Sequence, residues 1–305
     1  MAKVFIDGSA GTTGLRIHER LSGRADLELI LLSDEHRKDP AYRKDALERA
    51  DIAFLCLPDA AAVEAVALAE GMPVKIIDTS TAHRTNDQWA YGFAELSKAH
   101  REAIRDSSRV ANPGCHASGF IASAYALTAH GLVAPEEQLI AYSLTGYSGG
   151  GKSLIAEYED PQRDPRHDSH RIYGTTLTHK HLPEMKKICG LAKTPLFSPI
   201  LGDFHSGMAT SLLLPDRDAK TVWECLSDHY AGEPMVTVAP LGGDESVIYA
   251  DTLAGKDTMR LWVTGHESQT MVTAVFDNLG KGASGAAIQN MNILLGLPET
   301  TGLSL

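Results

Sequence analysis

The stretch KVFIDGSAGTTG, residues 3–14, joins a short apolar run to a glycine-rich turn. The apolar run predicts a β-strand, and the following LRIHERLSG has the spacing of a helix that ends at a glycine. Gly8, Gly11 and Gly14 have GxxGxxG spacing, in which missing side chains let a pyrophosphate approach the backbone and let helix and strand pack closely. Three glycines in a turn are weak evidence by themselves, so the surrounding pattern has to decide.

The surrounding pattern alternates strands with helices. Apolar runs predict further strands near 27–33, 50–59 and 73–78, and residues 60–70 predict a helix. Near-continuous apolar strands that alternate with helices are typical of a doubly wound parallel sheet with helices on both faces. The first part of the chain is therefore expected to be a Rossmann domain, with these candidates for cofactor binding in its turn: Gly8, Ala10, Gly11, Thr12, Thr13 and Gly14.

The second part of the chain has a different pattern. Its strand-like runs are interrupted by one clear helix over 219–232, which predicts a mostly antiparallel sheet with helices on one face. A last helix, rich in small residues, follows Gly282 and ends before Pro298. The expected fold is therefore α/β, with a Rossmann domain over 1–113 and an α+β domain over 114–282.

Composition limits the classes of protein. The chain has 305 residues, of which 43% are hydrophobic, so it can bury the cores of two ordinary domains. Its net charge of −11 gives no positive field for nucleic acid or an anionic membrane. The apolar runs are of strand length and no signal peptide is recognisable, which predicts a cytoplasmic protein. The four cysteines lack CxxC spacing, so they are expected to be reduced thiols rather than disulfides or zinc ligands.

The end of the second predicted strand indicates which cofactor binds. An acidic residue at this position accepts a hydrogen bond from the ribose 2′-hydroxyl of NAD. Here the strand ends in Ser33 and Asp34, followed by Arg37 and Lys38. A serine hydroxyl with two cations favours the 2′-phosphate of NADP, whereas Asp34 keeps NAD possible. A solvated loop would also explain the two cations.

The stretch RVANPGCHASGF, residues 109–120, places Cys115 where a predicted strand turns into a predicted helix. N–H groups and the dipole at a helix N-terminus favour the thiolate, which is the form that attacks carbonyl carbon. A small apolar residue that fills a gap would explain the position equally well. A thiolate beside a nicotinamide cofactor suggests that an acyl group is captured as a thioester and reduced to an aldehyde.

Such chemistry also needs an acid or base, and THKHLPEM, residues 178–185, offers one. His179 and His181 precede a predicted helix in which Glu184 is positioned to orient an imidazole. Surface histidines at a helix entrance are the alternative. Two histidines without a third ligand at an obvious spacing make a poor metal site, so no metal is expected.

The glycine loop GYSGGGKS, residues 146–153, is a candidate for binding phosphate, together with Arg84. Consecutive N–H groups in such loops bind anions, and Ser148 and Lys152 add a hydroxyl and a charge. The loop matches the P-loop pattern GxxxxGK[ST] literally. An ATP site is not expected, because the following acidic stretch is predicted to be irregular rather than helical.

The chain resembles the N-acetyl-gamma-glutamyl-phosphate reductases in seven motifs that occur in the same order, and its length resembles their shorter type. The motifs are GSAGTTG, DTSTAHR, YGFAEL, ANPGC, GYSGGGKS, HKHLPE and DNLGKGASGAAIQNMNILLGLPETTGL. The resemblance implies NADPH-dependent reduction of N-acetyl-glutamyl 5-phosphate to the semialdehyde, with release of phosphate, in arginine biosynthesis. It also implies a homodimer or homotetramer, and a C-terminal helix, 283–305, that returns to the cofactor domain.

The resemblance assigns roles to individual residues. Cys115 matches the nucleophile, and the HxHxPE segment places the acid or base at His179 or His181, with His179 favoured. Asn112 is a further substrate candidate and Asn290 a further cofactor candidate. Three positions depart from the family's pattern: His83 replaces a phenylalanine, His116 a tyrosine, and Lys152 an arginine.

Three other functions compete with this interpretation. An aspartate-semialdehyde dehydrogenase performs the same chemistry on a shorter acyl phosphate and shares DNLGKGA, but the Asn-Pro-Gly before Cys115 argues against it. A reductase of a carrier-protein-linked glutamyl phosphate would need basic surface, and this chain is acidic. A non-catalytic Rossmann sensor would tolerate loss of the thiol or the histidines, and this chain has both.

Overall fold

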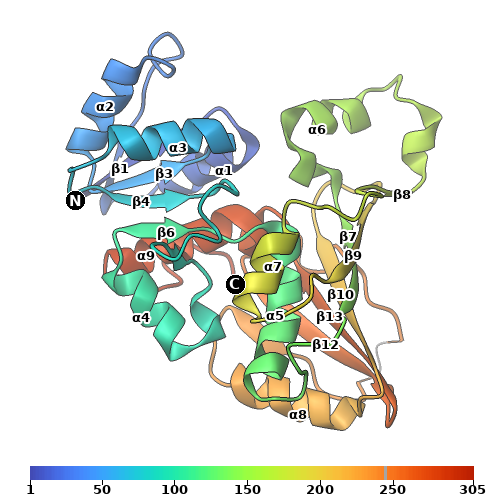
Figure 1. Cartoon of the computed structure of the whole chain (residues 1–305). Coiled ribbons are helices and arrows are strands. Elements are labelled where there is room, and N and C mark those ends of the chain that lie inside the picture. Colours follow the sequence, from blue (N-terminus) through green and yellow to red (C-terminus); the bar gives the residue numbers. More distant parts are fainter. Residues whose placement is uncertain (244–245) are drawn as a thin grey trace. The chain divides into compact units, whose positions relative to one another are not determined.

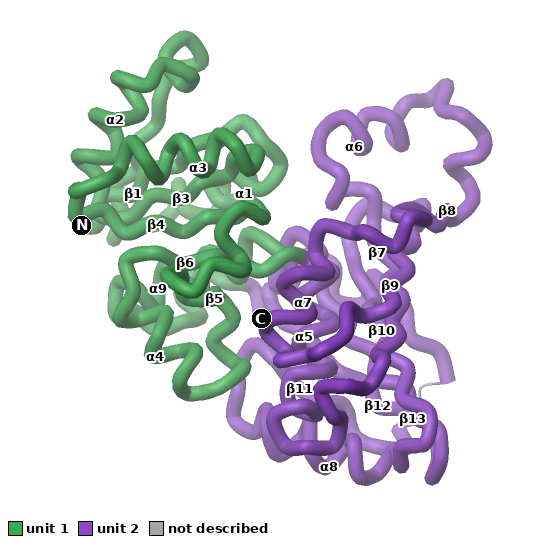
Figure 2. The backbone as a smooth tube through the Cα atoms, viewed as in Figure 1, with its two compact units in different colours: residues 1–114, 283–303 green, residues 115–282, 304–305 purple. Residues whose placement is uncertain are grey.

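The computed structural model describes residues 1–243 and 246–305 (Figure 1). The chain divides into two compact units (Figure 2). The first contains Met1–Gly114 and Ala283–Leu303, and the second contains Cys115–Gly282 and Ser304–Leu305. Each unit is built around one sheet.

The first unit has a six-stranded sheet in the order β2-β1-β3-β4-β6-β5, and all its strand pairs are parallel. The chain leaves β1 toward one side of the sheet and later enters β3 on the other side, which makes the carboxyl end of β1 the topological switch point where ligands bind in such folds. The strands are β1 (Ala2–Asp7), β2 (Leu27–Ile30), β3 (Ile52–Leu55), β4 (Lys75–Asp78), β5 (Ala90–Tyr91) and β6 (Arg109–Ala111).

Helices cover both faces of this sheet, because consecutive strand residues, whose side chains point to opposite faces, are buried alike. In β1, Val4 and Ile6 pack with α1, α4 and α9, whereas Phe5 packs with α2 and α3. Both faces of the strand are therefore apolar, which explains its continuous hydrophobic sequence. The helices are α1 (Thr12–Leu21), α2 (Pro40–Arg49), α3 (Asp59–Leu68), α4 (Lys98–Asp106) and α9 (Gly285–Leu294).

No helix was predicted from the sequence where α2 and α4 lie. The apolar positions of α2 are few, so the hydrophobic pattern did not reveal it. Its N-terminus does carry a local signal, because the Asp39 side chain accepts a hydrogen bond from the N–H of Ala41 at 2.8 Å and Pro40 occupies the first turn. Helix α4 begins similarly, with Ser97 capping the N–H of His100.

The second unit has a seven-stranded sheet in the order β11-β12-β13-β10-β7-β9-β8. The β11–β12 and β7–β9 pairs are parallel and the others are antiparallel, so the predicted mostly antiparallel sheet is confirmed. The strands are β7 (Ile140–Thr145), β8 (Arg171–Ile172), β9 (Leu196–Leu201), β10 (Met208–Pro215), β11 (Val236–Val238), β12 (Met259–His266) and β13 (Gln269–Phe276).

Helix α5 (Cys115–Ala129) packs against β10 and β13 on one face of this sheet and also contacts α7 (Leu182–Ile188) and α8 (Ala219–His229). Nearly all of its residues are buried, so the helix is apolar around most of its circumference. Gly119 allows the close approach. A Cβ atom there would lie 2.5 Å from Thr210 Oγ1 and 2.8 Å from Phe276 Cε1.

The prediction of irregular structure over residues 154–165 was wrong for 154–159, which belong to helix α6 (Gly151–Glu159), whereas 160–164 lie outside any helix or strand. The acidic residues of this stretch suggested a solvated loop. The apolar residues of α6 are instead anchored by Tyr158, which is buried and stacks between Tyr147 and His167 with ring centroids 4.8 Å away on each side.

A test of α5 packing uses two glycines with different surroundings. Gly119→Ala is expected to lower the free energy of unfolding by about 1–3 kcal/mol, because overpacking outweighs the gain of about 1 kcal/mol in helix propensity. Gly23→Ala is the control, because no atom lies within 4 Å of a Cβ built there. Urea unfolding of both variants measures the effect, and equal stability of the two would contradict the packing argument.

Candidate active site

Cys115 is the first residue of α5, and β6 ends four residues earlier at Ala111. Asn112, Pro113 and Gly114 connect the strand to the helix, and no regular turn is assigned to them. The Cys115 side chain is half-buried. It therefore lies at the N-terminus of a 15-residue helix, where the helix dipole favours negative charge on sulfur.

Three histidines and a tyrosine gather beside this helix terminus within the second unit. The His116 ring lies 5.3 Å from the ring of His179 and 5.8 Å from that of His181. His179 and His181 are 4.8 Å apart in the T-shaped arrangement. His116 Nε2 lies 2.6 Å from the phenol oxygen of Tyr173. Residues from three separate segments thus surround the start of α5.

Burial sets the charge of these groups. It lowers the pKa of His116 to about 3, with smaller contributions from His179 and Lys180, and it lowers the pKa of His179 to about 4, with a contribution from Lys180. Burial, and the nearby charge on Cys115, raise the pKa of Tyr173 well above its usual range. Near pH 7 the cluster therefore contains two neutral imidazoles and a protonated phenol.

The two candidate acid/base histidines differ in exposure. His179 is half-buried, and its Nδ1 accepts a hydrogen bond from the N–H of His181 at 3.3 Å. A neutral His179 consequently carries its proton on Nε2. His181 is buried at the start of α7, and Glu184 is buried in the first turn of that helix. The assignment of His179 as acid or base, with Glu184 as its orienting group, stays a prediction.

The glycine loop does not have the geometry of an anion-binding loop over its first four residues. The N–H groups of 146–149 all donate to backbone carbonyls: Gly146 to Gly207, Tyr147 to Phe204, Ser148 to His205 and Gly149 to Gly146. These N–H groups are therefore unavailable to a phosphate. This observation argues against a P-loop. The expectation that no helix follows the loop cannot be used for this purpose, because α6 is present.

The two phosphate candidates of this loop lie in different surroundings. Ser148 is buried, and its hydroxyl accepts a hydrogen bond from Asn278 Nδ2 at 3.0 Å and lies 3.3 Å from the hydroxyl of Ser206. Lys152 is exposed in the first turn of α6. A role in phosphate binding thus suits the charge of Lys152 better than the enclosed hydroxyl of Ser148.

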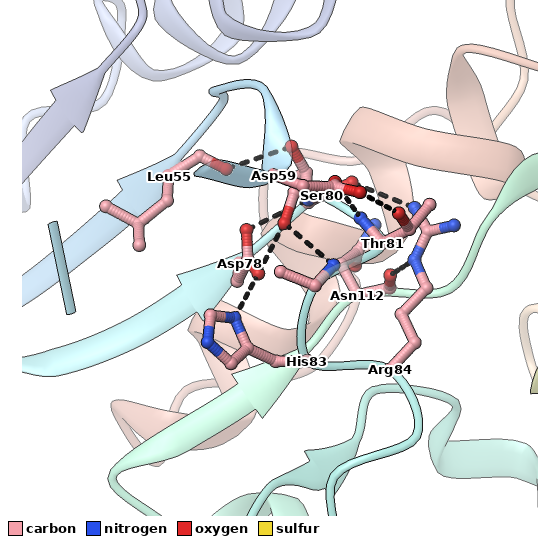
Figure 3. Close-up of polar contacts among 10 residues, drawn as sticks. Leu55, Asp59, Asp78, Ser80, Thr81, His83, Arg84 and Asn112 are labelled. Carbon is pink, nitrogen blue, oxygen red and sulfur yellow. Dashed lines mark hydrogen bonds and ion pairs between the residues drawn. The ribbon is translucent and has the colours of Figure 1, made fainter. Parts of the chain in front are cut away.

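The remaining substrate candidates belong to a polar network of the first unit (Figure 3). Arg84 is buried, and it donates from Nε to the carbonyl of Asn112 at 2.9 Å and from Nη2 to the carbonyl of Thr79 at 2.8 Å. Asn112 donates from Nδ2 to the carbonyl of Ala283 and accepts at Oδ1 from Asn290 Nδ2. These contacts hold the turn before Cys115 in place, whatever further role the two residues have.

His83 has a structural partner in the same network. Its Nδ1 lies 2.6 Å from Oδ2 of Asp78, a carboxylate at the end of β4 that also accepts from the N–H and hydroxyl of Ser80. The His83 ring stacks on Trp89 with centroids 4.1 Å apart. A phenylalanine could stack in this way but could not bond Asp78, so the departure from the family's pattern adds a hydrogen bond.

The glycine turn of the first unit fits a dinucleotide. Gly8 has φ +86°, and a Cβ there would lie 2.3 Å from the carbonyl oxygen of Cys56; a Cβ at Gly14 would lie 2.4 Å from the carbonyl oxygen of Gly8. Only glycine suits such close packing. Helix α1 begins at Thr12 without a side-chain cap, and the buried Thr12 hydroxyl has no hydrogen-bond partner among the described residues. A pyrophosphate would satisfy both features.

A pocket of about 340 Å³ opens beside this turn and is lined by Gly8, Ser9, Leu32, Arg37, Lys38 and Arg43, among others. Arg43 is occupied, because it forms a buried ion pair with Asp7 at 2.9 Å. Arg37 pairs with the exposed Asp34 at 3.1 Å. Ser33 bonds His36, with 2.9 Å between Oγ and Nδ1. Lys38 has no polar partner among the described residues, which leaves it available to an anion.

The predicted cofactor residue Asn290 lies in α9, within the first unit. Its amide nitrogen donates to the carbonyl of Gly92 at 2.9 Å as well as to Asn112. The side chain therefore ties α9 to the turn before Cys115. Its part in cofactor binding stays a prediction.

Two family models match the chain: the semialdehyde dehydrogenase NAD-binding domain over residues 3–106 and the semialdehyde dehydrogenase dimerisation domain over residues 115–278. The N-acetyl-gamma-glutamyl-phosphate reductase of Rhizobium meliloti is 49% identical over 308 residues, which cover 96% of this chain and 98% of that protein. The N-acetyl-gamma-glutamyl-phosphate reductase 2 of Pseudomonas putida is 43% identical over 309 residues, covering 98% of each. The chain belongs to the N-acetyl-gamma-glutamyl-phosphate reductase family.

Solved structures agree on the fold of this family. The aspartate semialdehyde dehydrogenase II of Vibrio cholerae, complexed with ASA, has a TM-score of 0.74 at 18% identity, covering 97% of this chain and 98% of that one. The aspartate semialdehyde dehydrogenase of Francisella tularensis has a TM-score of 0.73 at 15% identity, covering 97% and 100%. The predicted family, fold class and oxidoreductase class are thus confirmed.

Within 1–243 and 246–305, no helix is long and apolar enough to cross a membrane. The same residues contain no group of three or more His, Cys, Asp or Glu side chains placed to hold a metal ion. His116 illustrates why the histidine cluster is not such a group, because both of its ring nitrogens bond protein hydroxyls.

Sequence reasoning missed Tyr173, Ser143 and Thr210, which surround His116. Ser143 Oγ lies 2.8 Å from His116 Nδ1 and 2.8 Å from Thr210 Oγ1. The sequence contained only a weak signal for Ser143 and Thr210. Both hydroxyls occupy positions in β7 and β10 whose neighbours two residues away are buried, so a polar residue there needs an internal partner.

The buried neutral His116 predicts a pH dependence of stability. Its pKa is about 3 in the folded chain and 6.5 when unperturbed. Below about pH 6.5 the unfolded chain binds more protons, so this residue makes the fold less stable as the pH falls, by about 2 kcal/mol between pH 7 and pH 5. Urea unfolding at both pH values should show that loss reduced in His116→Gln. An unchanged pH dependence in this variant would contradict the assigned neutral state.

Proposed function

We propose that the chain reduces N-acetyl-L-glutamyl 5-phosphate to N-acetyl-L-glutamate 5-semialdehyde with NADPH, releasing phosphate, as a step of arginine biosynthesis. The observation that carries the proposal is Cys115 at the N-terminus of α5, beside two neutral histidines and a protonated tyrosine. The names of the relatives supply the substrate.

The first half of the reaction uses the sulfur of Cys115. The thiolate attacks the acyl carbon, the carbon–oxygen bond to the phosphate breaks, and phosphate leaves with the electron pair of that bond. The helix terminus stabilises the sulfur anion before attack. The product is a thioester on Cys115 that has the same oxidation state as the acyl phosphate.

The second half needs a reductant and a proton donor. NADPH, when bound, supplies a hydride to the carbonyl carbon of the thioester. The carbonyl oxygen then gains a negative charge, which an N–H or O–H donor of the cluster stabilises or protonates; His179, with its proton on Nε2, has such a donor. The oxygen then re-forms the carbonyl and returns any proton it gained to its donor, while the carbon–sulfur bond breaks and sulfur leaves as the thiolate with the electron pair, which releases the aldehyde.

Several residues support NADPH as the reductant. The Thr12 hydroxyl and the start of α1 suit the pyrophosphate, and Lys38 in the pocket beside Gly8 suits a 2′-phosphate. Asp34 is engaged by Arg37, so the carboxylate that would favour NAD is partly neutralised. The proposal therefore includes NADP(H) as the preferred cofactor.

The assay is best run in reverse, because the acyl phosphate is labile. Purified protein is offered NADP⁺, phosphate and either N-acetyl-glutamate semialdehyde or aspartate semialdehyde. A strong preference for the acetylated substrate is expected. Cys115→Ser should lower turnover at least about 1000-fold with cofactor binding intact, because an alcohol is a far weaker nucleophile than a thiolate.

Cys225→Ser is the matched control, because Cys225 lies on α8 and bonds the carbonyl of Ala126 in α5. It should keep normal turnover. Turnover retained by Cys115→Ser would exclude the thioester mechanism. Preference for aspartate semialdehyde would assign the alternative substrate, and cofactor binding without turnover would favour the sensor.

We infer that the second unit joins copies of the chain into a dimer or tetramer through the outer face of its sheet. Ile140, Leu196 and Leu213 are register partners on β7, β9 and β10, and they are 38%, 44% and 36% exposed. Such a row on the face opposite α5 is unfavourable in water. The match of residues 115–278 to a dimerisation domain supports the inference.

Sedimentation velocity tests this surface with charge substitutions. Ile140→Lys, in the middle of the row, is expected to shift the protein toward monomer, because a buried unpaired charge opposes association. Val63→Lys is the control, since Val63 is an exposed apolar residue on α3 in the first unit. A monomeric wild-type protein, or an unchanged assembly in Ile140→Lys, would contradict the inference.

A further inference from the structure

His116 links two groups of hydroxyls in the interior of the second unit. On one side, its Nδ1 lies 2.8 Å from Ser143 Oγ, which in turn lies 2.8 Å from Thr210 Oγ1. On the other side, its Nε2 lies 2.6 Å from the phenol oxygen of Tyr173. His116, Ser143 and Thr210 are all buried. The four residues form one hydrogen-bonded chain from the core to Tyr173.

The chain can run continuously in two directions; in a third arrangement Ser143 accepts from both His116 and Thr210, which leaves the buried Ser143 O–H without an acceptor. A neutral imidazole has one N–H and one lone pair, so His116 donates to one neighbour and accepts from the other. In the outward direction, Thr210 donates to Ser143, Ser143 donates to Nδ1, and Nε2–H donates to Tyr173. In the inward direction, every one of these bonds is reversed.

Thr210 decides between the two directions. Its hydroxyl has no other hydrogen-bond partner among the described residues. In the inward direction the Thr210 O–H would be a buried donor without an acceptor, which costs about 1–3 kcal/mol. In the outward direction the O–H without a protein acceptor is that of Tyr173, which is half-buried, rather than that of the fully buried Thr210. The outward direction is therefore favoured, with the His116 proton on Nε2.

In the outward direction Tyr173 accepts a hydrogen bond from His116, so its own O–H is available to a different acceptor. Among the described residues, the Tyr173 hydroxyl has no second partner. Tyr173 is also close enough to Cys115 for the charge on sulfur to affect its titration. A phenol O–H that is near Cys115 and does not donate to His116 can donate to a group carried by Cys115.

We propose that Tyr173 donates a hydrogen bond to the carbonyl oxygen of the acyl group on Cys115, and that His116 is the positioning residue that makes Tyr173 a donor. Both assignments rest on the proposed reductase reaction. The carbonyl oxygen gains negative charge when sulfur attacks and again when hydride is added, and a fixed donor stabilises that charge more than it stabilises the ground state.

Steady-state kinetics test the role of Tyr173 in the reverse assay. Tyr173→Phe keeps the ring and removes the donor, and it is expected to lower kcat about 100-fold with a change in KM of less than about 3-fold. Tyr142→Phe is the matched control, because its hydroxyl contacts Met271 and it should be fully active. Activity of Tyr173→Phe within about 3-fold of wild type would overturn the proposal.

Two substitutions of His116 separate positioning from packing. In Gln the amide N–H group takes the place of Nε2–H, so His116→Gln should keep kcat within about 10-fold of wild type. In Asn the shorter side chain can bond Ser143 but cannot reach Tyr173, so His116→Asn should lose about as much activity as Tyr173→Phe. Equal loss in both variants, with folding intact by circular dichroism, would overturn the positioning role.

The protonated nitrogen of His116 can be measured without any turnover. In ¹⁵N NMR of the wild-type protein, the ring nitrogens of His116 should show the Nε2–H tautomer near pH 7, and Thr210→Val should weaken that preference. The Nδ1–H tautomer would overturn the proposal even in an active enzyme. A wild-type protein inactive on N-acetyl-glutamate semialdehyde would overturn the reductase function, whereas the tautomer would still test how His116 orients Tyr173.

Discussion

The burial of α5 is the constraint on which the second unit depends. The helix has almost no exposed side, so each polar group along its first turns needs an internal partner. Ser123 bonds the carbonyl of Gly119 within the helix, and His116 bonds hydroxyls of β7 and of the segment before α7. Cys115, at the terminus of this helix, thus projects from a support that is fixed both by packing and by hydrogen bonds.

The same requirement shapes the turn before Cys115 in the first unit. Asn112 uses its N–H, its carbonyl and both ends of its side-chain amide on protein partners. Arg84 donates to two backbone carbonyls, and Asp78 accepts from two residues of the next turn. The motif residues proposed as substrate ligands therefore also form hydrogen bonds with buried backbone groups. A loss of activity when they are substituted would not by itself show that they contact the substrate.

The sequence predicted the elements whose patterns are local. The GxxGxxG turn, the start of α5 at Cys115 and the helix with Pro183 in its first turn each depend on neighbours within a few residues, and each is present. Helix α2 was missed because its apolar face is narrow. Helix α6 was missed because the acidic residues of the stretch suggested a solvated loop, although Tyr158 is buried. The link between His116 and Ser143 spans 27 residues, and Ser143 meets Thr210 only through the register of β7 and β10, so no local pattern contains them.

The neutral histidines bear on how the site works near pH 7. With its pKa lowered to about 4 by burial and by Lys180, His179 does not hold a stored proton before substrate arrives. A nearby negative charge raises the pKa of an imidazole, and the reaction brings such charge, first on the acyl phosphate and then on the reduced thioester. His179 consequently gains basicity as the charge develops, while Tyr173 stays protonated because burial and the Cys115 charge act in the same direction on it. Burial therefore gives the two groups different properties in the proposed reaction: Tyr173 keeps its proton, and His179 stays neutral until negative charge develops nearby.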